Sequence, residues 1–179
     1  MMPDCHSGDS DVDFDLGSFL LWLNVRYYFL CEISIRRIDM HYQFEVKGLP
    51  PKKDGATSMW GKKLESERLV ALRQAALKAF SGQPPLRSNI KLILKIRIPV
   101  NNRSIGDLDT FVSGVCDSLM KRDPRSKLYE ETWSNPEYQD VHPDKRIAIV
   151  DDSQVIGIRA EKVIGDLNQQ RYEVMLEGE

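Results

Sequence analysis

The stretch IKLILKIRI at residues 90–98 alternates strictly between two kinds of side chain. Isoleucine or leucine occupies every even position from Ile90 to Ile98, whereas the odd positions carry Ile93 and three basic residues. Alternation with a period of two places successive side chains on opposite faces of a β-strand. We therefore expect a strand with one buried face, whose basic face is simply exposed to solvent.

Segments on both sides of this strand show either the same alternation or a helical period. Four further segments are predicted strands: residues 41–46, 147–150, 155–163 and 171–176. Apolar residues recur at helical spacing in residues 64–80 and 107–120, which are therefore predicted helices. The order of these elements predicts an α/β (α+β) fold, a single domain with a mixed β-sheet and two main helices packed on one face.

Composition places the chain among ordinary globular proteins. Its 179 residues are 41% apolar, which is too apolar for a disordered chain. Three cysteines and three histidines are scattered at no metal-ligand spacing, so we expect neither a zinc site nor a disulfide framework, and we expect a reduced, cytoplasmic protein. Residues 40–179 hold 22 basic and 20 acidic residues, a surplus too small to indicate nucleic-acid binding by itself.

The first 39 residues form an acidic leader that runs into an apolar stretch at residues 16–31. This stretch is shorter than the roughly 20 residues of a membrane-spanning helix and contains Asn24 and Arg26, so no membrane segment is expected. Its acidic start is also unlike a secretory signal. Two explanations remain, an element added to the domain or a segment foreign to the natural protein, and the strand directly after Met40 favours the second. We therefore divide the chain into an extension, residues 1–39, and a domain, residues 40–179.

Two acidic pairs are candidates for chemistry. Asp107 and Asp109 stand at the start of the second predicted helix, and Asp151 and Asp152 stand in a turn before a strand. Each pair suits an ordinary capping or turn role. Together, carboxylates at the ends of adjacent elements can hold Mg²⁺, the usual metal for cutting a phosphodiester. An aspartyl-phosphate phosphatase is not favoured because no buried strand precedes Asp107, and no glycine-rich loop predicts a nucleotide cofactor.

Two motifs carry a resemblance to a known family. GDLDTFVSGVCDSL at residues 106–119, followed by VDDSQVIGIRAEKV at residues 150–163, resembles the RusA-type Holliday-junction resolvases. The resemblance extends from about Met40 to the C-terminus and includes the opening strand that ends at Pro50-Pro51. It implies a small homodimeric α/β endonuclease, often prophage-borne, that needs Mg²⁺ and cuts branched DNA (four-way junctions) in recombination and repair.

The resemblance also implies roles for particular residues. Asp107, Asp109 and Asp152 match the catalytic metal ligands, and Asp151 matches an uncertain fourth ligand. The basic loop after the opening strand would grip DNA phosphates, an interaction that weakens steeply with salt, through Lys52, Lys53, Lys62 and Lys63.

Two departures from the family pattern affect this interpretation. Ser113 stands where family members commonly carry a lysine, which favours an alternative, a DNA-junction-binding relative without turnover. Lys121 or the lysines after Pro51 could replace that charge. The connection of residues 120–146 is unusually long, and we expect its polar and aromatic side chains to decorate a solvated loop rather than contact DNA: Arg122, Arg125, Lys127, Trp133, Lys145 and Arg146.

Overall fold

The alternating stretch at residues 90–98 lies within strand β2 (Ile90–Pro99), in the interior of a four-stranded sheet. The structure is a computed structural model that describes residues 40–54, 58–100, 106–165 and 170–178. The prediction of one buried face is confirmed, because five side chains of β2 are at most 1% exposed: Ile90, Leu92, Leu94, Ile96 and Ile98.

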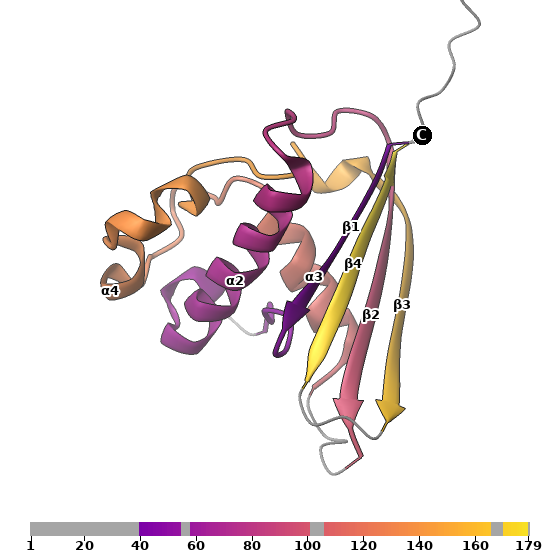
Figure 1. The fold of residues 1–179 in the computed structure, drawn as a ribbon. Coiled ribbons are helices and arrows are strands. Elements are labelled where there is room, and N and C mark those ends of the chain that lie inside the picture. The colour runs from indigo at the N-terminus through magenta and orange to yellow at the C-terminus, as the bar shows by residue number, and fades with distance from the viewer. Residues whose placement is uncertain (1–39, 55–57, 101–105, 166–169, 179) are drawn as a thin grey trace, which may run out of the picture. The chain divides into compact units, whose positions relative to one another are not determined.

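Three further strands complete the sheet in the order β1-β4-β2-β3. They are β1 (His41–Lys47), β3 (Val155–Gly165) and β4 (Arg171–Gly178). β4 runs antiparallel to both β1 and β2, whereas β3 runs parallel to β2, so the sheet is mixed as predicted. β1 and β3 form its two edges (Figure 1).

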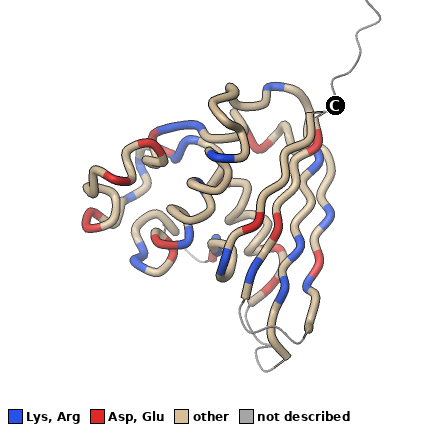
Figure 2. The backbone as a smooth tube through the Cα atoms, in the orientation of Figure 1, with Lys and Arg blue, Asp and Glu red and all other residues tan. Residues whose placement is uncertain are grey.

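Helices α2 (Lys63–Phe80) and α3 (Leu108–Leu119) cover one face of this sheet (Figure 1). Their apolar faces pack on the even positions of β2, with Leu72, Phe111 and Val115 fully buried. The opposite face of the sheet carries charged side chains, and Figure 2 shows basic and acidic positions interspersed along the strands. The α+β fold with two main helices on one face is therefore confirmed.

The predicted strand at residues 147–150 is wrong. Ile147, Ala148 and Ile149 are at most 3% exposed, as their apolar character requires, but the only β-type pairing here is an isolated bridge from Ile149 to Leu86. Their three N–H groups all point to the carbonyl oxygen of Leu119, at 3.1–3.4 Å. The end of α3 thus satisfies backbone groups that a neighbouring strand would otherwise bond.

The connection of residues 120–146 is folded rather than a solvated loop. It contains helix α4 (Glu130–Trp133) and the 3₁₀-helix η2 (Pro136–Val141). Trp133 is 3% exposed, and its Nε1 donates a hydrogen bond of 3.2 Å to the carbonyl of Trp60. Both tryptophans belong to a second hydrophobic cluster, formed with Met59, Leu69 and Val70.

Arg73, on the buried face of α2, ties this connection to the rest of the domain. Its side chain is fully buried, and its guanidinium has five N–H donors. Every donor is used, because the group makes hydrogen bonds to five backbone carbonyls: Ser118, Met120, Val141, His142 and Lys145. Burial lowers the pKa of Arg73 to about 9, so the cation persists at neutral pH.

Residues 1–39, and with them the predicted extension, lie outside the described residues. Within the described ranges, no helix has the length and apolar character needed to cross a bilayer.

Candidate active site

The Asp-Asp turn before β3 is held by its own side chains. Asp151 caps the short 3₁₀-helix η3 (Asp152–Gln154), and its Oδ1 accepts a hydrogen bond of 2.9 Å from the N–H of Ser153. The same hydrogen bond lowers the pKa of the Asp151 carboxyl. Asp151 therefore has the turn role that its residue type permits.

Gln154 fixes the other side of this turn. Its Oε1 accepts hydrogen bonds from the N–H groups of Val150 and Asp151, at 2.8 and 2.9 Å. Its Nε2 donates to the carbonyls of Leu86 and Ser88, both at 3.0 Å. The Asp-Asp-x-Gln spacing thus builds a rigid turn that leaves the side chain of Asp152 exposed.

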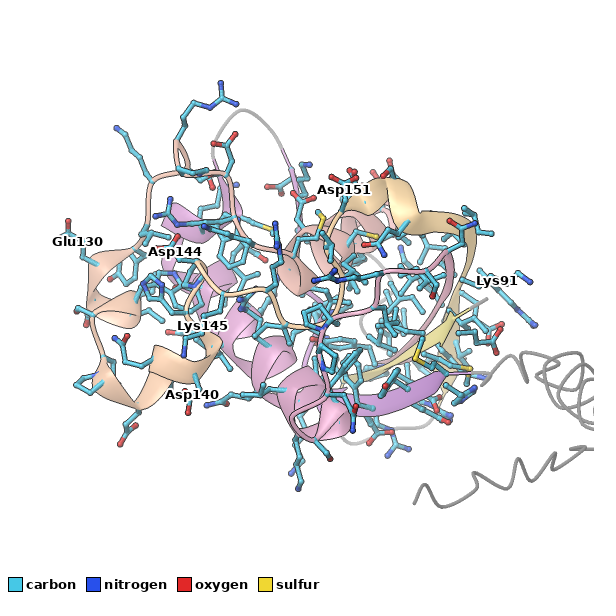
Figure 3. All side chains as sticks on the ribbon, turned by 90° about the horizontal axis from the view of Figure 1, so that it is seen from above. Lys91, Glu130, Asp140, Asp144, Lys145 and Asp151 are labelled. Atoms are coloured by element: carbon cyan, nitrogen blue, oxygen red, sulfur yellow. The ribbon has the colours of Figure 1, made fainter. Side chains whose placement is uncertain are left out.

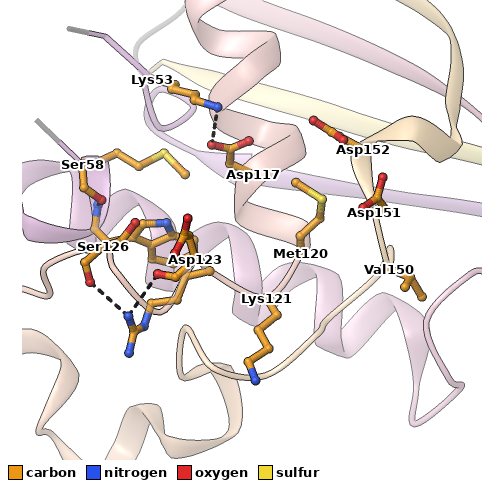
Figure 4. A pocket seen from close by; sticks show the side chains of 13 residues that line it. Lys53, Ser58, Asp117, Met120, Lys121, Asp123, Ser126, Val150, Asp151 and Asp152 are labelled. Carbon is orange, nitrogen blue, oxygen red and sulfur yellow. Dashed lines mark hydrogen bonds and ion pairs between the residues drawn. The ribbon is translucent and has the colours of Figure 1, made fainter. Parts of the chain in front are cut away.

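The C-terminal half of α3 faces this turn across a cleft (Figure 4). Asp117 projects into the cleft, where its Oδ2 lies 2.8 Å from the Nζ of Lys53. The hydrogen bond to Asp117 raises the pKa of Lys53, and the negative charge of Asp152 adds to the effect. Our sequence analysis missed Asp117, although a residue one helical turn after Ser113 shares its face of the helix.

The cleft has a volume of about 750 Å³ and is lined by charges of both signs. Its acidic residues are Asp117, Asp123, Asp151 and Asp152, and its basic residues are Lys53, Lys121 and Arg122. A smaller pocket of about 320 Å³ is also lined by Lys53, Asp117 and Asp152, together with Ser113 and Cys116. Burial raises the pKa of the Cys116 thiol to about 11, so this cysteine stays protonated and unreactive at neutral pH.

Asp107 and Asp109 stand at the opposite end of α3. Asp107 occupies the N-cap position, but its carboxylate makes no capping hydrogen bond. Both residues are exposed. Asp109 precedes Asp117 by eight positions, about 12 Å along the helix axis. The structure therefore places Asp117, Asp151 and Asp152 on the lining of one cleft, whereas Asp107 and Asp109 stand two turns or more before Asp117 on α3 and do not line this cleft.

Two lysines approach the start of α3. The ammonium of Lys52 lies 5.2 Å from the ring centre of Phe111. Lys162, on β3, donates a hydrogen bond to the carbonyl of Gly106 and lies 5.9 Å from the same ring centre. Both cations lie near the N-terminus of α3, which carries Asp107 and Asp109. Sequence reasoning missed Lys162, because a lone lysine in a strand gives no signal of this position.

The cleft offers carboxylate oxygens, the kind of ligand that Mg²⁺ prefers. The described residues contain no group of three or more His, Cys, Asp or Glu side chains that could hold a metal. However, Mg²⁺ is commonly bound through one or two carboxylates, with substrate phosphates and water completing its octahedron. Asp117 and Asp152 line the same cleft and supply such hard oxygen ligands. The donor set therefore fits an Mg²⁺ ion shared with a phosphate.

Of the four lysines predicted to bind DNA, Lys53 alone lines the cleft. Lys62 makes an ion pair of 2.7 Å with Asp54, and Lys63 is an exposed residue at the start of α2. Lys52 is half-buried against α3.

Several basic residues of the connection are engaged in ion pairs. Arg122 lies 2.8 Å from Asp144, and its side chain is only 13% exposed. Lys145 pairs with Asp140 at 3.2 Å, on the segment labelled in Figure 3. Exposed Arg125 pairs with Asp123 at 2.7 Å. Arg122 therefore stabilises the connection, as does Trp133, whereas exposed residues such as Lys121, Lys127 and Arg146 remain available to a ligand.

Compared with known proteins, the chain matches no family model and no curated protein.

Proposed function

We propose that the chain is a cytoplasmic, structure-selective DNA endonuclease that cuts four-way junctions with Mg²⁺ as its cofactor. One observation carries this proposal. The Asp-Asp-x-Gln turn and the helix that the Asp-x-Asp motif opens, which together carry the RusA-type resemblance, face each other across one cleft with a lysine between them. Carboxylates beside a cation are the groups that phosphodiester hydrolysis requires.

Within this proposal, Asp152 and Asp117 would hold Mg²⁺ in the cleft, and Asp151 would keep the turn in place. The bound ion would supply an activated water and neutralise charge on the scissile phosphate. Lys53 would bind a phosphate oxygen where negative charge develops. Lys121, exposed at the rim of the cleft, would contact a flanking phosphate.

Asp107 and Asp109 remain proposed metal ligands on the resemblance alone, and they can be tested separately from the cleft. We expect Asp109→Asn to abolish Mg²⁺-dependent cleavage of a four-way junction while leaving folding and junction binding nearly intact, because an amide is a poor ligand for a hard cation. Asp140→Asn, another exposed carboxylate outside both sites, is the matched control. Undiminished cleavage by Asp109→Asn would reduce Asp109 to an acidic residue in the first turn of α3.

The second candidate function is a junction-binding protein without turnover, and Ser113 favours it. The experiment that separates the two is a cleavage assay of the full chain on a four-way junction, a fork and a linear duplex, with Mg²⁺ and with chelator. Cleavage of the junction in Mg²⁺ alone supports the endonuclease. Tight junction binding without cleavage in any divalent metal would support the binding protein.

A further inference from the structure

A second pocket lies between α2 and the connection of residues 120–146, and it shares no lining residue with the cleft. Its volume is about 320 Å³, and two aromatic side chains line it, Tyr129 before α4 and Tyr138 of η2. Ligand pockets of proteins measure roughly 300–1,000 Å³. This pocket therefore has room for one side chain or a small molecule, but not for a helix or a strand.

Contacts between α2 and the connection fix the walls of the pocket. The Oγ1 of Thr132 lies 3.0 Å from the Oγ of Ser66 on α2. The N–H of Tyr129 donates a hydrogen bond of 2.9 Å to the carbonyl of Trp60, against which Trp133 is buried. A ligand would therefore meet a site that is already formed, which lowers the entropic cost of binding.

Two carboxylates and one ammonium stand beside the aromatic rings. Glu131 accepts a hydrogen bond from the hydroxyl of Tyr129 through one oxygen, which leaves its second oxygen for another donor. This hydrogen bond raises the pKa of Tyr129, and the negative charge of Glu67 adds to the effect, so both carboxylates act on one phenol. Glu67 is exposed and makes no ion pair with a described residue. Lys63 is the only base on the lining.

The surroundings of the pocket are acidic as well. Residues 128–144 carry five acidic side chains and neither lysine nor arginine. Glu130 and Asp140 of this segment are exposed (Figure 3). The preceding residues 121–127 carry four basic side chains and one acidic side chain, and they include residues that line the cleft. The connection thus presents its basic part at the cleft and its acidic part at the pocket.

We propose that this pocket binds an arginine side chain of a protein partner. A cation over the face of a tyrosine ring is attracted by the ring electrons. A guanidinium also stacks on aromatic rings through its plane and donates hydrogen bonds to carboxylates in a fork, which a lysine ammonium cannot do. The lining of Tyr129, Tyr138, Glu67 and Glu131 offers both kinds of contact.

The charge around the pocket decides between this ligand and a nucleobase. An unpaired base could also stack on the two tyrosines. However, a base brings its phosphates with it, and the five acidic side chains of residues 128–144 repel them. The same side chains attract a basic segment of a protein.

Binding of short peptides to the full chain tests the chemistry of the ligand. The probe is acetyl-Gly-Gly-Arg-Gly-Gly-amide, and a matched peptide carries citrulline, which has the shape of arginine without its charge. Amide shifts in the ¹⁵N–¹H spectrum locate the bound peptide and give its Kd. We expect the arginine peptide to shift the amides of Glu131, Thr132 and Asn135, a lysine peptide to bind more weakly, and the citrulline peptide to cause no shift.

Substitutions on the lining test the site itself. Glu67→Gln and Glu131→Gln should each raise the Kd by up to about fivefold, the effect of losing one exposed ion pair. Tyr138→Leu should raise it by a similar factor, since it removes a cation–π contact but keeps apolar bulk. Lys63→Met should instead lower the Kd, because it removes the charge that repels the ligand. Glu137→Gln, an exposed residue of η2 outside the lining, is the matched control and should leave the Kd nearly unchanged.

Several results would overturn the proposal: equal binding of the citrulline peptide, shifts at cleft residues such as Asp117 instead of at the pocket, or a Kd that neither glutamate substitution changes. Tighter binding of methylguanidinium than of the peptide would identify a small-molecule site, and shifts at the pocket caused by oligothymidylate would identify a site for a base. Either outcome would exclude the protein partner. None of these readouts involves cleavage, so their failure leaves the proposed endonuclease activity untouched.

Discussion

Gly114 of α3 and Pro51 of the loop after β1 are in closest contact where the loop crosses the helix. A β-carbon on Gly114 would lie 2.0 Å from the carbonyl oxygen of Pro51, far inside any real contact. The N–H of Lys53 donates a hydrogen bond of 3.1 Å to the carbonyl of Thr110, and the N–H of Lys52 donates one of 2.7 Å to Glu65. The missing side chain of Gly114 therefore lets the loop lie against α3, which places Lys53 beside Asp117.

Gly114→Ala tests this contact. Helix propensity alone would make alanine more stable than glycine by about 1 kcal/mol. We expect the opposite, destabilisation by about 1–3 kcal/mol, because the obstacle is a backbone atom that cannot move without displacing the loop. Thermal unfolding measures the difference, and junction cleavage should fall as Lys53 moves. Gly157→Ala is the matched control, because its β-carbon would meet only the flexible stem of a lysine, at 3.1 Å. Equal melting temperatures for both variants would contradict our account of Gly114.

Substitutions of Asp151 and of Asp152 should have different effects, although the two residues are neighbours. Asp152→Asn should abolish cleavage with little change in melting temperature, since the exposed carboxylate makes no capping bond. Asp151→Ala should lower the melting temperature by a few degrees, because η3 loses its cap, and should reduce cleavage less. If instead Asp151→Ala abolishes cleavage and Asp152→Asn lowers the melting temperature, the two residues have the opposite roles.

The stability difference caused by Asp151 should also depend on pH. The folded state lowers the pKa of its carboxyl below the ordinary 3.8, so the stabilisation is fully present above that value. It is lost as the pH falls through the lowered pKa, because the protonated cap binds the Ser153 N–H less well. The gap in melting temperature between the wild type and Asp151→Ala should therefore be complete at neutral pH and close in strong acid. A gap that persists in strong acid would indicate another cause.

Arg73 should be the most sensitive position of α2. Arg73→Met keeps an apolar stem but leaves five carbonyls without their donor, and we expect a loss of about 3–5 kcal/mol. The connection should loosen first, which the fluorescence of buried Trp133 would report. Lys78→Met, on the exposed side of the same helix, is the control and should be nearly neutral. Near-wild-type stability of Arg73→Met would mean that hydrophobic packing alone holds the connection.

The strands and main helices could be predicted from the sequence because their apolar residues repeat with the period of the element they form. The fold of residues 120–146 could not, since it depends on contacts between distant residues. Arg73 resembles any exposed arginine of an amphipathic helix, and Trp60 lies 73 positions before Trp133. Nothing in the local sequence around Arg73, Trp60 or Trp133 predicts that these side chains are buried.

The candidate site was predictable to a similar extent. The Asp-Asp-x-Gln motif marks its turn. Which of the two aspartates caps the turn, and which keeps a carboxylate without a capping hydrogen bond, depends on a hydrogen bond that either aspartate could make. The ion pair between Asp117 and Lys53 depends on the close approach of the loop after β1 to Gly114. The spacing of residues in the sequence does not reveal this approach. The wrong strand at residues 147–150 has a similar origin, because burial beneath the end of α3 and burial in a sheet select the same apolar residues.

The last prediction concerns the charge that Ser113 cannot supply. Lys53 lies in the smaller pocket with Ser113, Asp117 and Asp152, so we expect it to provide the cation that a lysine at residue 113 would otherwise provide. Lys53→Met should lower the single-turnover rate of junction cleavage about a hundredfold, since a cation beside developing charge contributes on the order of 3 kcal/mol. Junction affinity should change much less, because only one phosphate contact is lost.

Rescue distinguishes this role from a structural one. Ser113→Lys should add little to the wild type, but it should restore most of the rate to Lys53→Met, because residue 113 lies one helical turn from Asp117 and reaches the same pocket. Lys62→Met, in the same basic loop but paired with Asp54 outside the cleft, is the control and should cleave at nearly the wild-type rate. If Lys53→Met cleaves normally, the cation comes from elsewhere, and Lys121 at the rim of the cleft is the next candidate. If Lys53→Met is slow and Ser113→Lys does not restore it, Lys53 acts by holding Asp117 in place rather than by binding phosphate.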